Sequence, residues 1–161
     1  MNYDFYHSPI GLLYLESTDT GICSIKLIDQ KDQHDPMPSI HTTEAKRELD
    51  EYFDRKRQRF EVSLDMSGGT IFQQNVWNLL KEIPYGSTTS YQSIADKLNN
   101  PLSVRAVGMA NGKNPIPIIV PCHRVIGSSG SLVGYALGID IKKKLLSLEN
   151  PKEHGFQTTI F

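Results

Sequence analysis

One stretch of the chain carries the residue types of nucleophilic chemistry. An apolar run over residues 116–120, which predicts a strand, leads to Pro121, and Cys122, His123 and Arg124 follow directly. Cysteine attacks as a thiolate, and its thiol pKa falls beside a histidine or an arginine. His123 is therefore a candidate base, and Arg124 raises the local positive potential. The same residues also fit a buried, inert cysteine at the end of a strand, so the surrounding sequence must decide.

The other chemical residue types do not form a comparable pattern. Two cysteines, Cys23 and Cys122, are too few for a disulfide scaffold. Cys23 lies in an alternating apolar segment and is interpreted as a packing residue. No C-x-x-C or H-x-x-x-H spacing occurs among the cysteines and histidines. We therefore expect no metal site and no cofactor.

The first part of the chain is typical of a scaffold. Alternating apolar residues between turn clusters predict three strands of an antiparallel meander, over residues 3–6, 11–16 and 21–28. A charged helix is predicted near residues 44–54, with Thr42 or Thr43 as its cap. Residues 60–64 alternate like a further strand.

A Ser-Gly-Gly hinge at residues 67–69 separates an acidic part from a basic part. The residues up to 68 carry eight Lys or Arg against 13 Asp or Glu, a net charge of −5, and the rest carry nine against five, a net charge of +4. We expect domains of residues 1–68 and 69–161, of which only the second meets a polyanion. Because membrane-length apolar runs and signal-peptide features are absent, we expect a cytoplasmic protein without a membrane partner.

Short helices surround the cysteine in the second part. Thr70 is the predicted cap of a helix that runs to about Glu82, and residues 89–92 fit a capping box for the next helix. Ser103 is the predicted cap of a helix over residues 104–111. The helix that follows residues 89–92 and the helix over residues 104–111 together indicate a helix-turn-helix, although a simple helical hairpin fits their spacing equally well.

Small residues and one arginine characterise the second helix of that pair. Arg105 lies near its start, where a helix end favours phosphate. Ala106, Gly108 and Ala110 would leave the backbone close to the surface.

The last predicted helix begins after Asp140, its expected cap, and covers residues 141–149. Its three successive lysines at 142–144 are interpreted as a solvated basic face. Glu149 ends this helix, where a carboxylate opposes the macrodipole and therefore suggests a partner, for which His123 is the candidate.

Four motifs together resemble a known family: Ser90-Tyr91-x-x-Ile94-Ala95, Arg105-Ala106-Val107-Gly108, Asn114-Pro115 and Ile119-Val120-Pro121-Cys122-His123-Arg124-Val125. Their order and spacing over about residues 70–150 resemble the methylated-DNA–protein-cysteine methyltransferases, or O6-alkylguanine-DNA alkyltransferases. The resemblance implies an α/β (α+β) fold. A ribonuclease-H-like sheet-plus-helix domain would precede a mainly helical domain with a helix-turn-helix.

The resemblance also assigns chemical roles. Cys122 would take the alkyl carbon from guanine O6 and keep it as a thioether, so that each molecule acts once. His123 would take the thiol proton through a water, and Glu149 would orient the imidazole. Asn114 would hold the active-site turn, and Tyr91 would donate a proton to the departing base.

The implied partner is double-stranded DNA that contains O6-alkylguanine, with activity on O4-alkylthymine left open. The target base would be flipped out, Arg105 would fill the gap, and the helix would enter the minor groove. The residues implied at the DNA are Arg105, Ala106, Gly108, Ala110 and Arg124, and those implied in the base pocket are Val125, Tyr135 and Ala136. We expect a monomer in the absence of DNA, and nucleoid association during repair.

Two other functions fit parts of the sequence. Alkyltransferase-like proteins bind alkylated DNA without repairing it, but they replace the acceptor cysteine, which is present here as Cys122. A Cys-His hydrolase would use the same two residue types with repeated attack by water. Turnover separates these functions, because an alkyltransferase stops at one equivalent of product.

Overall fold

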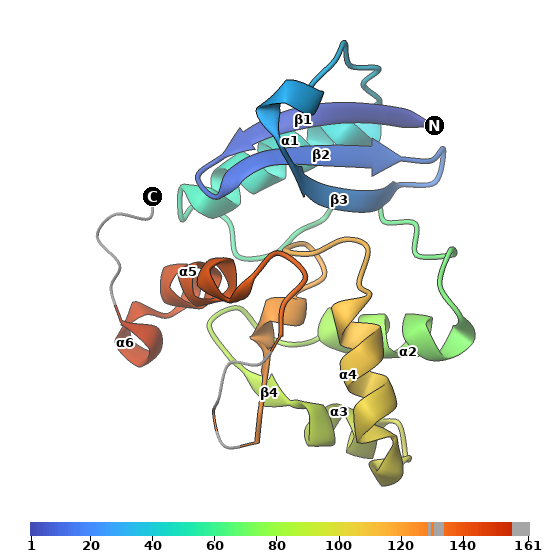
Figure 1. Ribbon diagram of the computed structural model, residues 1–161, viewed down its shortest axis with the longest axis vertical. Coiled ribbons are helices and arrows are strands. Elements are labelled where there is room, and N and C mark those ends of the chain that lie inside the picture. The colour runs from blue at the N-terminus through green and yellow to red at the C-terminus, as the bar shows by residue number, and fades with distance from the viewer. Residues whose placement is uncertain (129, 131–133, 156–161) are drawn as a thin grey trace. The chain divides into compact units, whose positions relative to one another are not determined.

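The computed structural model describes residues 1–128, 130 and 134–155 (Figure 1). Two compact units make up this part of the chain, one of Met1–Gly68 and one that begins at Gly69. The first contains a small sheet with a helix and the second is mainly helical, which confirms the predicted α/β fold class. No helix among the described residues is long and apolar enough to cross a bilayer.

The first unit is an antiparallel three-stranded sheet covered on one face by a helix (Figure 1). Its strands follow one another in the sheet as predicted: β1 (Asn2–Ser8), β2 (Gly11–Ser17) and β3 (Ile22–Ile28). Helix α1 (Ile40–Phe53) buries Leu49 and Tyr52 completely. The 3₁₀ turn η1 (Gln30–Asp32) lies between β3 and α1.

Two local predictions for this unit are wrong. The cap of α1 is Ser39: its hydroxyl accepts from the Thr42 N–H at 3.1 Å, and the Thr42 hydroxyl accepts from the Ser39 N–H at 2.8 Å. Among the described residues, the segment at 60–64 forms one isolated bridge, between Leu64 and Ile22, and no strand. The buried Glu48 carboxylate accepts the N–H groups of residues 61 and 62 at 2.8 and 3.1 Å, and these groups are therefore not available to a strand.

The second unit consists of short helices around one parallel pair of two-residue strands (Figure 1). The helices are α2 (Ile71–Leu80), α3 (Tyr91–Lys97), α4 (Val104–Gly112), α5 (Ile139–Glu149) and α6 (Pro151–His154). Strand β4 (Thr89–Ser90) pairs with β5 (Val125–Ile126). This pairing brings the start of α3 beside the segment that follows Cys122.

The helix caps in this unit agree only partly with the sequence patterns. Thr70 caps α2 in a reciprocal box with Gln73, as predicted for Thr70. Ser90, within β4, caps α3, and Thr89 does not. The hydroxyl of Ser103 donates to the Asn100 carbonyl in the 3₁₀ turn η2 (Pro101–Ser103) and does not cap α4. Helix α5 begins at Ile139, so Asp140 lies in its first turn.

The apolar run before Cys122 is a buried turn and not a strand. The Val120 N–H donates to the Ile116 carbonyl at 2.9 Å, and Ile118 has a φ of +76°, which β-branched residues rarely adopt. The Asn114 side chain closes this turn from inside, since its Nδ2 donates to the Val120 carbonyl at 2.8 Å and its Oδ1 accepts from the Ile116 N–H at 3.0 Å. The 3₁₀ turn η3 (Cys122–Arg124) follows directly.

Candidate active site

Cys122 opens η3, and only 2% of the residue is exposed. Burial raises the pKa of its thiol to about 11, because a thiolate would lose its hydration in this site. A hydrogen bond from Asn114 and the nearby charge of Lys142 act in the opposite direction. The resting side chain is therefore a neutral thiol at neutral pH, and it needs a base to become a nucleophile.

His123, Glu149 and Arg124 form a buried cluster next to Cys122 in the chain. His123 Nε2 lies 2.7 Å from Glu149 Oε2, and neither side chain is more than 1% exposed. The Arg124 guanidinium donates to both carboxylate oxygens, at 2.8 and 3.0 Å, and to the Ile83 carbonyl at 2.7 Å. Burial disfavours the carboxylate, but the charges and hydrogen bonds of His123 and Arg124 outweigh it and hold the pKa of Glu149 well below its ordinary value.

This cluster determines which nitrogen of His123 is free to accept a proton. An ionised carboxylate only accepts hydrogen bonds, so Nε2 carries the hydrogen that it shares with Glu149. Nδ1 then holds the lone pair of the neutral ring, and this buried atom makes no hydrogen bond to the described residues. A neutral thiol next in sequence to an oriented base is an arrangement that generates a nucleophile on demand.

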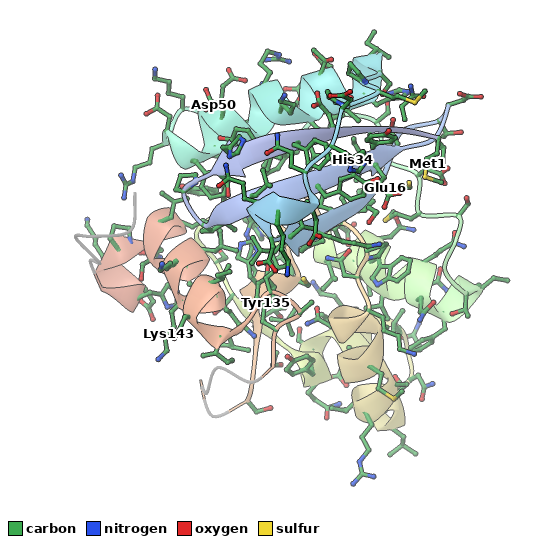
Figure 2. All side chains as sticks on the ribbon, turned by 45° about the horizontal axis from the view of Figure 1, so that its top comes forward. Met1, Glu16, His34, Asp50, Tyr135 and Lys143 are labelled. Carbon is green, nitrogen blue, oxygen red and sulfur yellow. The ribbon has the colours of Figure 1, made fainter. Side chains whose placement is uncertain are left out.

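Two basic residues that we expected at the surface are buried. Arg124, predicted to contact DNA, is 5% exposed and uses its guanidinium on Glu149 and the Ile83 carbonyl, so it does not face solvent. Lys142 is fully buried, and its Nζ donates to the Val125 carbonyl at 2.8 Å. Only the neighbouring Lys143 is exposed as predicted (Figure 2). Buried cations require such partners, and sequence periodicity does not reveal them.

A cavity of about 420 Å³ adjoins this site, because its lining residues Asn111 and Tyr135 contact Cys122 and His123. It is lined by Tyr91, Val104, Gly108, Asn111, Gly112, Gly134, Tyr135 and Ala136. Burial and the nearby Cys122 raise the pKa of Tyr91, which keeps its phenol protonated. The Tyr135 ring (Figure 2) meets the His123 ring edge-on at 6.4 Å between centroids. Val125 is fully buried and is not among the lining residues.

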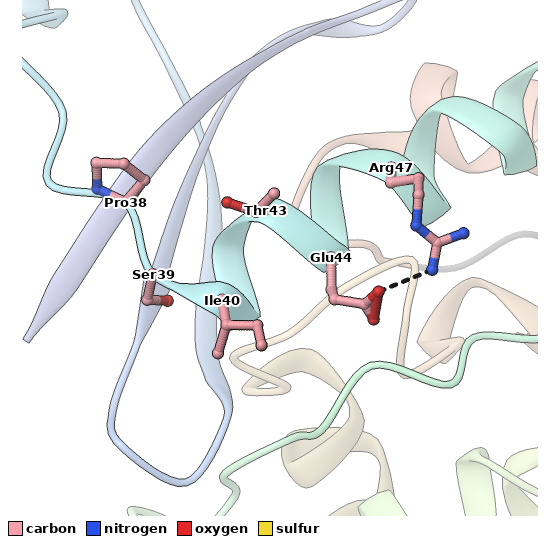
Figure 3. Close-up of a pocket in the computed structure, with 6 residues that line it drawn as sticks. All are labelled: Pro38, Ser39, Ile40, Thr43, Glu44 and Arg47. Atoms are coloured by element: carbon pink, nitrogen blue, oxygen red, sulfur yellow. Dashed lines mark hydrogen bonds and ion pairs between the residues drawn. The ribbon is translucent and has the colours of Figure 1, made fainter.

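A pocket at the start of α1, in the first unit, offers no comparable chemistry. Six residues at the start of α1 line it: Pro38, Ser39, Ile40, Thr43, Glu44 and Arg47 (Figure 3). Its one cation, Arg47, is paired with Glu44 and Glu51, each at 2.9 Å. Among the residues that the structure describes, no group of three or more His, Cys, Asp or Glu side chains could hold a metal ion.

Comparison with known proteins identifies the family. Residues 71–151 match the DNA binding domain of 6-O-methylguanine DNA methyltransferase, and residues 1–66 match the ribonuclease-like domain of the same enzyme. The methylated-DNA–protein-cysteine methyltransferase of Methanosarcina acetivorans is 46% identical over 154 residues, which cover 92% of this chain and 98% of the relative. The chain belongs to the methylated-DNA–protein-cysteine methyltransferases.

Solved structures of methyltransferases share the fold. The crystal structure of Mycobacterium tuberculosis OGT in complex with DNA is 44% identical, with a TM-score of 0.83 and coverage of 96% of this chain and 94% of that one. The O6-methylguanine DNA methyltransferase from Methanococcus jannaschii is 28% identical, with a TM-score of 0.67 and coverage of 96% and 98%. At this level, the function is DNA repair by alkyl transfer, and the DNA-binding segment of the methyltransferase contains Cys122.

The predicted DNA-binding residues of the methyltransferase lie in different places. The exposed residues of η2 and α4 include Leu102, Arg105, Ala106 and Met109. Gly108 is half-buried and lines the cavity. Ala110 is buried, and its carbonyl accepts a 2.8 Å hydrogen bond from Trp77 of α2, so the prediction that it lies near the DNA surface is wrong.

Sequence reasoning missed three residues at this site. Lys142 belongs to a run of three lysines that was interpreted as a solvated face. Asn111 lies near the end of α4, where the sequence patterns assigned no role to it. Leu102 is 95% exposed in η2, the turn before α4, where the sequence predicted only a helix cap. An exposed leucine carries no signal until the fold shows which residues surround it.

Proposed function

We propose that the chain repairs duplex DNA by a single, irreversible transfer of the alkyl group of O6-alkylguanine to Cys122. The observation that carries the proposal is the buried cluster next to this cysteine. His123 is held by Glu149 through one nitrogen and has a free acceptor atom at the other. This supplies the base that a thiol with a raised pKa requires.

In the proposed reaction, His123 Nδ1 takes the thiol proton through an intervening water, and the imidazolium that forms is stabilised by Glu149. The sulfur attacks the alkyl carbon, a C–S bond forms, and the C–O6 bond breaks with its electron pair passing to guanine. Tyr91 donates a proton to the base as this charge develops. The product thioether is not hydrolysed, so each protein molecule reacts once.

Asn114 has a positioning role in this proposal. Both polar atoms of its side-chain amide form hydrogen bonds to the backbone of the turn before Cys122. Its side chain also lowers the pKa of the thiol, against the larger effect of burial. It therefore fixes the sulfur and favours the thiolate once the proton leaves.

The exposed face of α4 is the proposed surface for the minor groove. Small Ala106 and half-buried Gly108 let the helix backbone approach a narrow groove. Arg105 projects from the same face and would occupy the stack vacated by the flipped base. Tyr135 and Ala136 line the cavity that would receive that base, and the Val125 backbone would contact its exocyclic amine.

Mass spectrometry tests the proposal directly. The protein is mixed with excess duplex that contains O6-methylguanine, and intact and tryptic masses are measured. We expect one added methyl group on the peptide that contains Cys122, one repaired base per protein, and no further turnover. Cys122→Ala should still bind the duplex without modification. A wild-type protein that binds but stays unmodified would instead be a non-repairing damage-binding protein, and continued turnover would indicate a hydrolase.

A further inference from the structure

The segment between α2 and β4 contains a turn whose shape follows from its sequence. The Ser87 N–H donates to the Pro84 carbonyl at 3.1 Å, which closes a β-turn, and Gly86 at the third position of this turn has a φ of +79°. A positive φ at that position alone is the type II geometry, which favours glycine there. Tyr85 therefore occupies the second position of a turn that the sequence itself determines.

Tyr85 packs against the cation of the buried cluster. The guanidinium carbon of Arg124 lies over the Tyr85 ring, 5.6 Å from its centroid, and the same guanidinium donates to the Ile83 carbonyl at 2.7 Å. A cation within about 6 Å of an aromatic face is attracted by the ring quadrupole, and more strongly where water is excluded. The Arg124 side chain is 7% exposed. This segment therefore supplies two of the contacts that hold the guanidinium.

The same turn also contacts the end of α5, the helix that ends at Glu149. Asn150 Nδ2 donates to the Gly86 carbonyl at 2.9 Å. A Cβ added to Gly86 would lie 3.4 Å from the backbone oxygen of Glu149, so the turn and the helix end are in close contact. One short segment thus holds both the arginine and the backbone that carries its carboxylate partner.

We propose that Tyr85 is a positioning residue for alkyl transfer, which holds Arg124 and, through Glu149, keeps His123 oriented as the base. This inference rests on the proposed function. The contacts follow one another directly, from ring to guanidinium, from guanidinium to carboxylate, and from carboxylate to imidazole. Because the planar guanidinium meets both carboxylate oxygens, a change in its orientation also turns the carboxylate away from His123 Nε2. Tyr85 is not among the residues that line the cavity, so its effect on the rate does not come from contact with the base.

Kinetics with two substitutions test this role. Single-turnover methyl transfer at saturating O6-methylguanine duplex is measured together with the affinity for the duplex. Tyr85→Leu removes the aromatic face and Tyr85→Phe keeps it. We expect Tyr85→Leu to slow transfer about fivefold at unchanged duplex affinity, and Tyr85→Phe to react at the wild-type rate. Tyr6→Leu is the matched control, at a half-buried tyrosine that stacks on Phe53 in the first unit, and it should leave the rate unchanged.

A double-mutant cycle separates positioning from general packing. In an Arg124→Met background the ring has no cation to hold, so Tyr85→Leu should cause no further loss of rate. Equal fold losses in the two backgrounds would show that Tyr85 does not act through Arg124 and would overturn the proposal. The same loss in Tyr85→Phe as in Tyr85→Leu would also overturn it, because phenylalanine keeps the aromatic face.

Proton NMR provides a readout that needs neither DNA nor the Arg124→Met variant to fold. The hydrogen between His123 Nε2 and Glu149 Oε2, which lie 2.7 Å apart, should give a downfield resonance. We expect this resonance to persist in Tyr85→Phe and to move upfield or exchange with water in Tyr85→Leu, and an unchanged resonance in Tyr85→Leu would overturn the proposal. Absence of any transfer by the wild-type protein would instead contradict the proposed function, and the resonance would still decide whether Tyr85 orients His123.

Discussion

Replacing Glu149 by glutamine tests the buried cluster most directly, because one carboxylate holds both the base and the arginine. Its oxygens accept hydrogen bonds from His123 at 2.7 Å and from two nitrogens of Arg124 at 2.8 and 3.0 Å. The substitution leaves the Arg124 cation buried without its counter-charge. Breaking a buried ion pair in this way costs about 3–5 kcal/mol. For a chain of this length, that corresponds to a fall in melting temperature of about 6–20 °C.

Thermal unfolding and single-turnover kinetics separate the two roles of Glu149. Glu149→Gln should lower both the melting temperature and the rate of methyl transfer. Adding Arg124→Met removes the uncompensated cation, so the double variant should recover part of the lost stability. Its transfer rate should stay low, since His123 still lacks its partner. A melting temperature within about 2 °C of the wild type for Glu149→Gln, or a double variant less stable than the single one, would refute this account of the cluster.

The acid limb of stability provides a further check on the same substitution. The pKa of Glu149 is depressed in the folded protein, so the unfolded chain binds the proton more readily. The stabilisation is fully present above the unfolded carboxyl pKa of about 4.3 and is lost as the pH falls below it. Glu149→Gln should therefore destabilise the protein strongly at pH 7, and its stability should fall less steeply than that of the wild type on acidification. Parallel acid limbs for the two proteins would contradict the cause assigned to this shift.

Three further predictions concern the nucleophile and the DNA surface. Arg105→Ala should slow repair of the duplex about 10- to 100-fold and leave the reaction with the free O6-alkylguanine base unchanged. Equal losses of the single-turnover rate on both substrates would exclude a role in base flipping. Lys142→Met should destabilise the fold by about 1–3 kcal/mol in urea titrations, because the Val125 carbonyl loses its donor. It should also raise the thiol pKa of Cys122, so that the thiolate absorbance at 240 nm develops at a higher pH than in the wild type. The thiol pKa of about 11 predicts that stability falls as the pH rises from the unfolded thiol value of about 8.5 towards 11. Cys122→Ala should make this alkaline slope less steep in denaturation curves, and the remaining slope comes from Cys23 and the tyrosines whose pKa values are also raised.

Local patterns predicted the parts of the fold that local interactions determine. The meander of the first unit follows from alternation and turn residues, and the Thr70 cap of α2 follows from a hydroxyl next to an amphipathic run. The apolar run at 116–120 was misjudged because its conformation depends on tertiary contacts. The Asn114 side chain replaces a strand partner there, and Ile118 is held at a φ of +76° that no propensity scale favours.

The burial of two cationic side chains is the second feature that the sequence did not predict. Arg124 and Lys142 are residue types that normally face solvent, and their positions gave no reason to expect otherwise. Each is buried because an acceptor from elsewhere in the fold satisfies it: Glu149 for Arg124, and the Val125 carbonyl for Lys142. The acid at the disfavoured end of α5 did point to a partner for Glu149, but not to a second one in the arginine.

The buried charges explain how a poorly acidic thiol is compatible with nucleophilic chemistry. In the proposed single-use reaction, the cysteine must stay unreactive until the correct base arrives, and burial, which raises the thiol pKa to about 11, keeps it protonated until then. In that reaction the base is His123 Nδ1, which is buried and makes no hydrogen bond to the described residues. Because Glu149 is already ionised and held by Arg124, the proposed proton transfer requires no prior change of charge at this carboxylate. The Arg124 guanidinium donates to the carboxylate that holds His123, so in the proposed reaction it acts through Glu149.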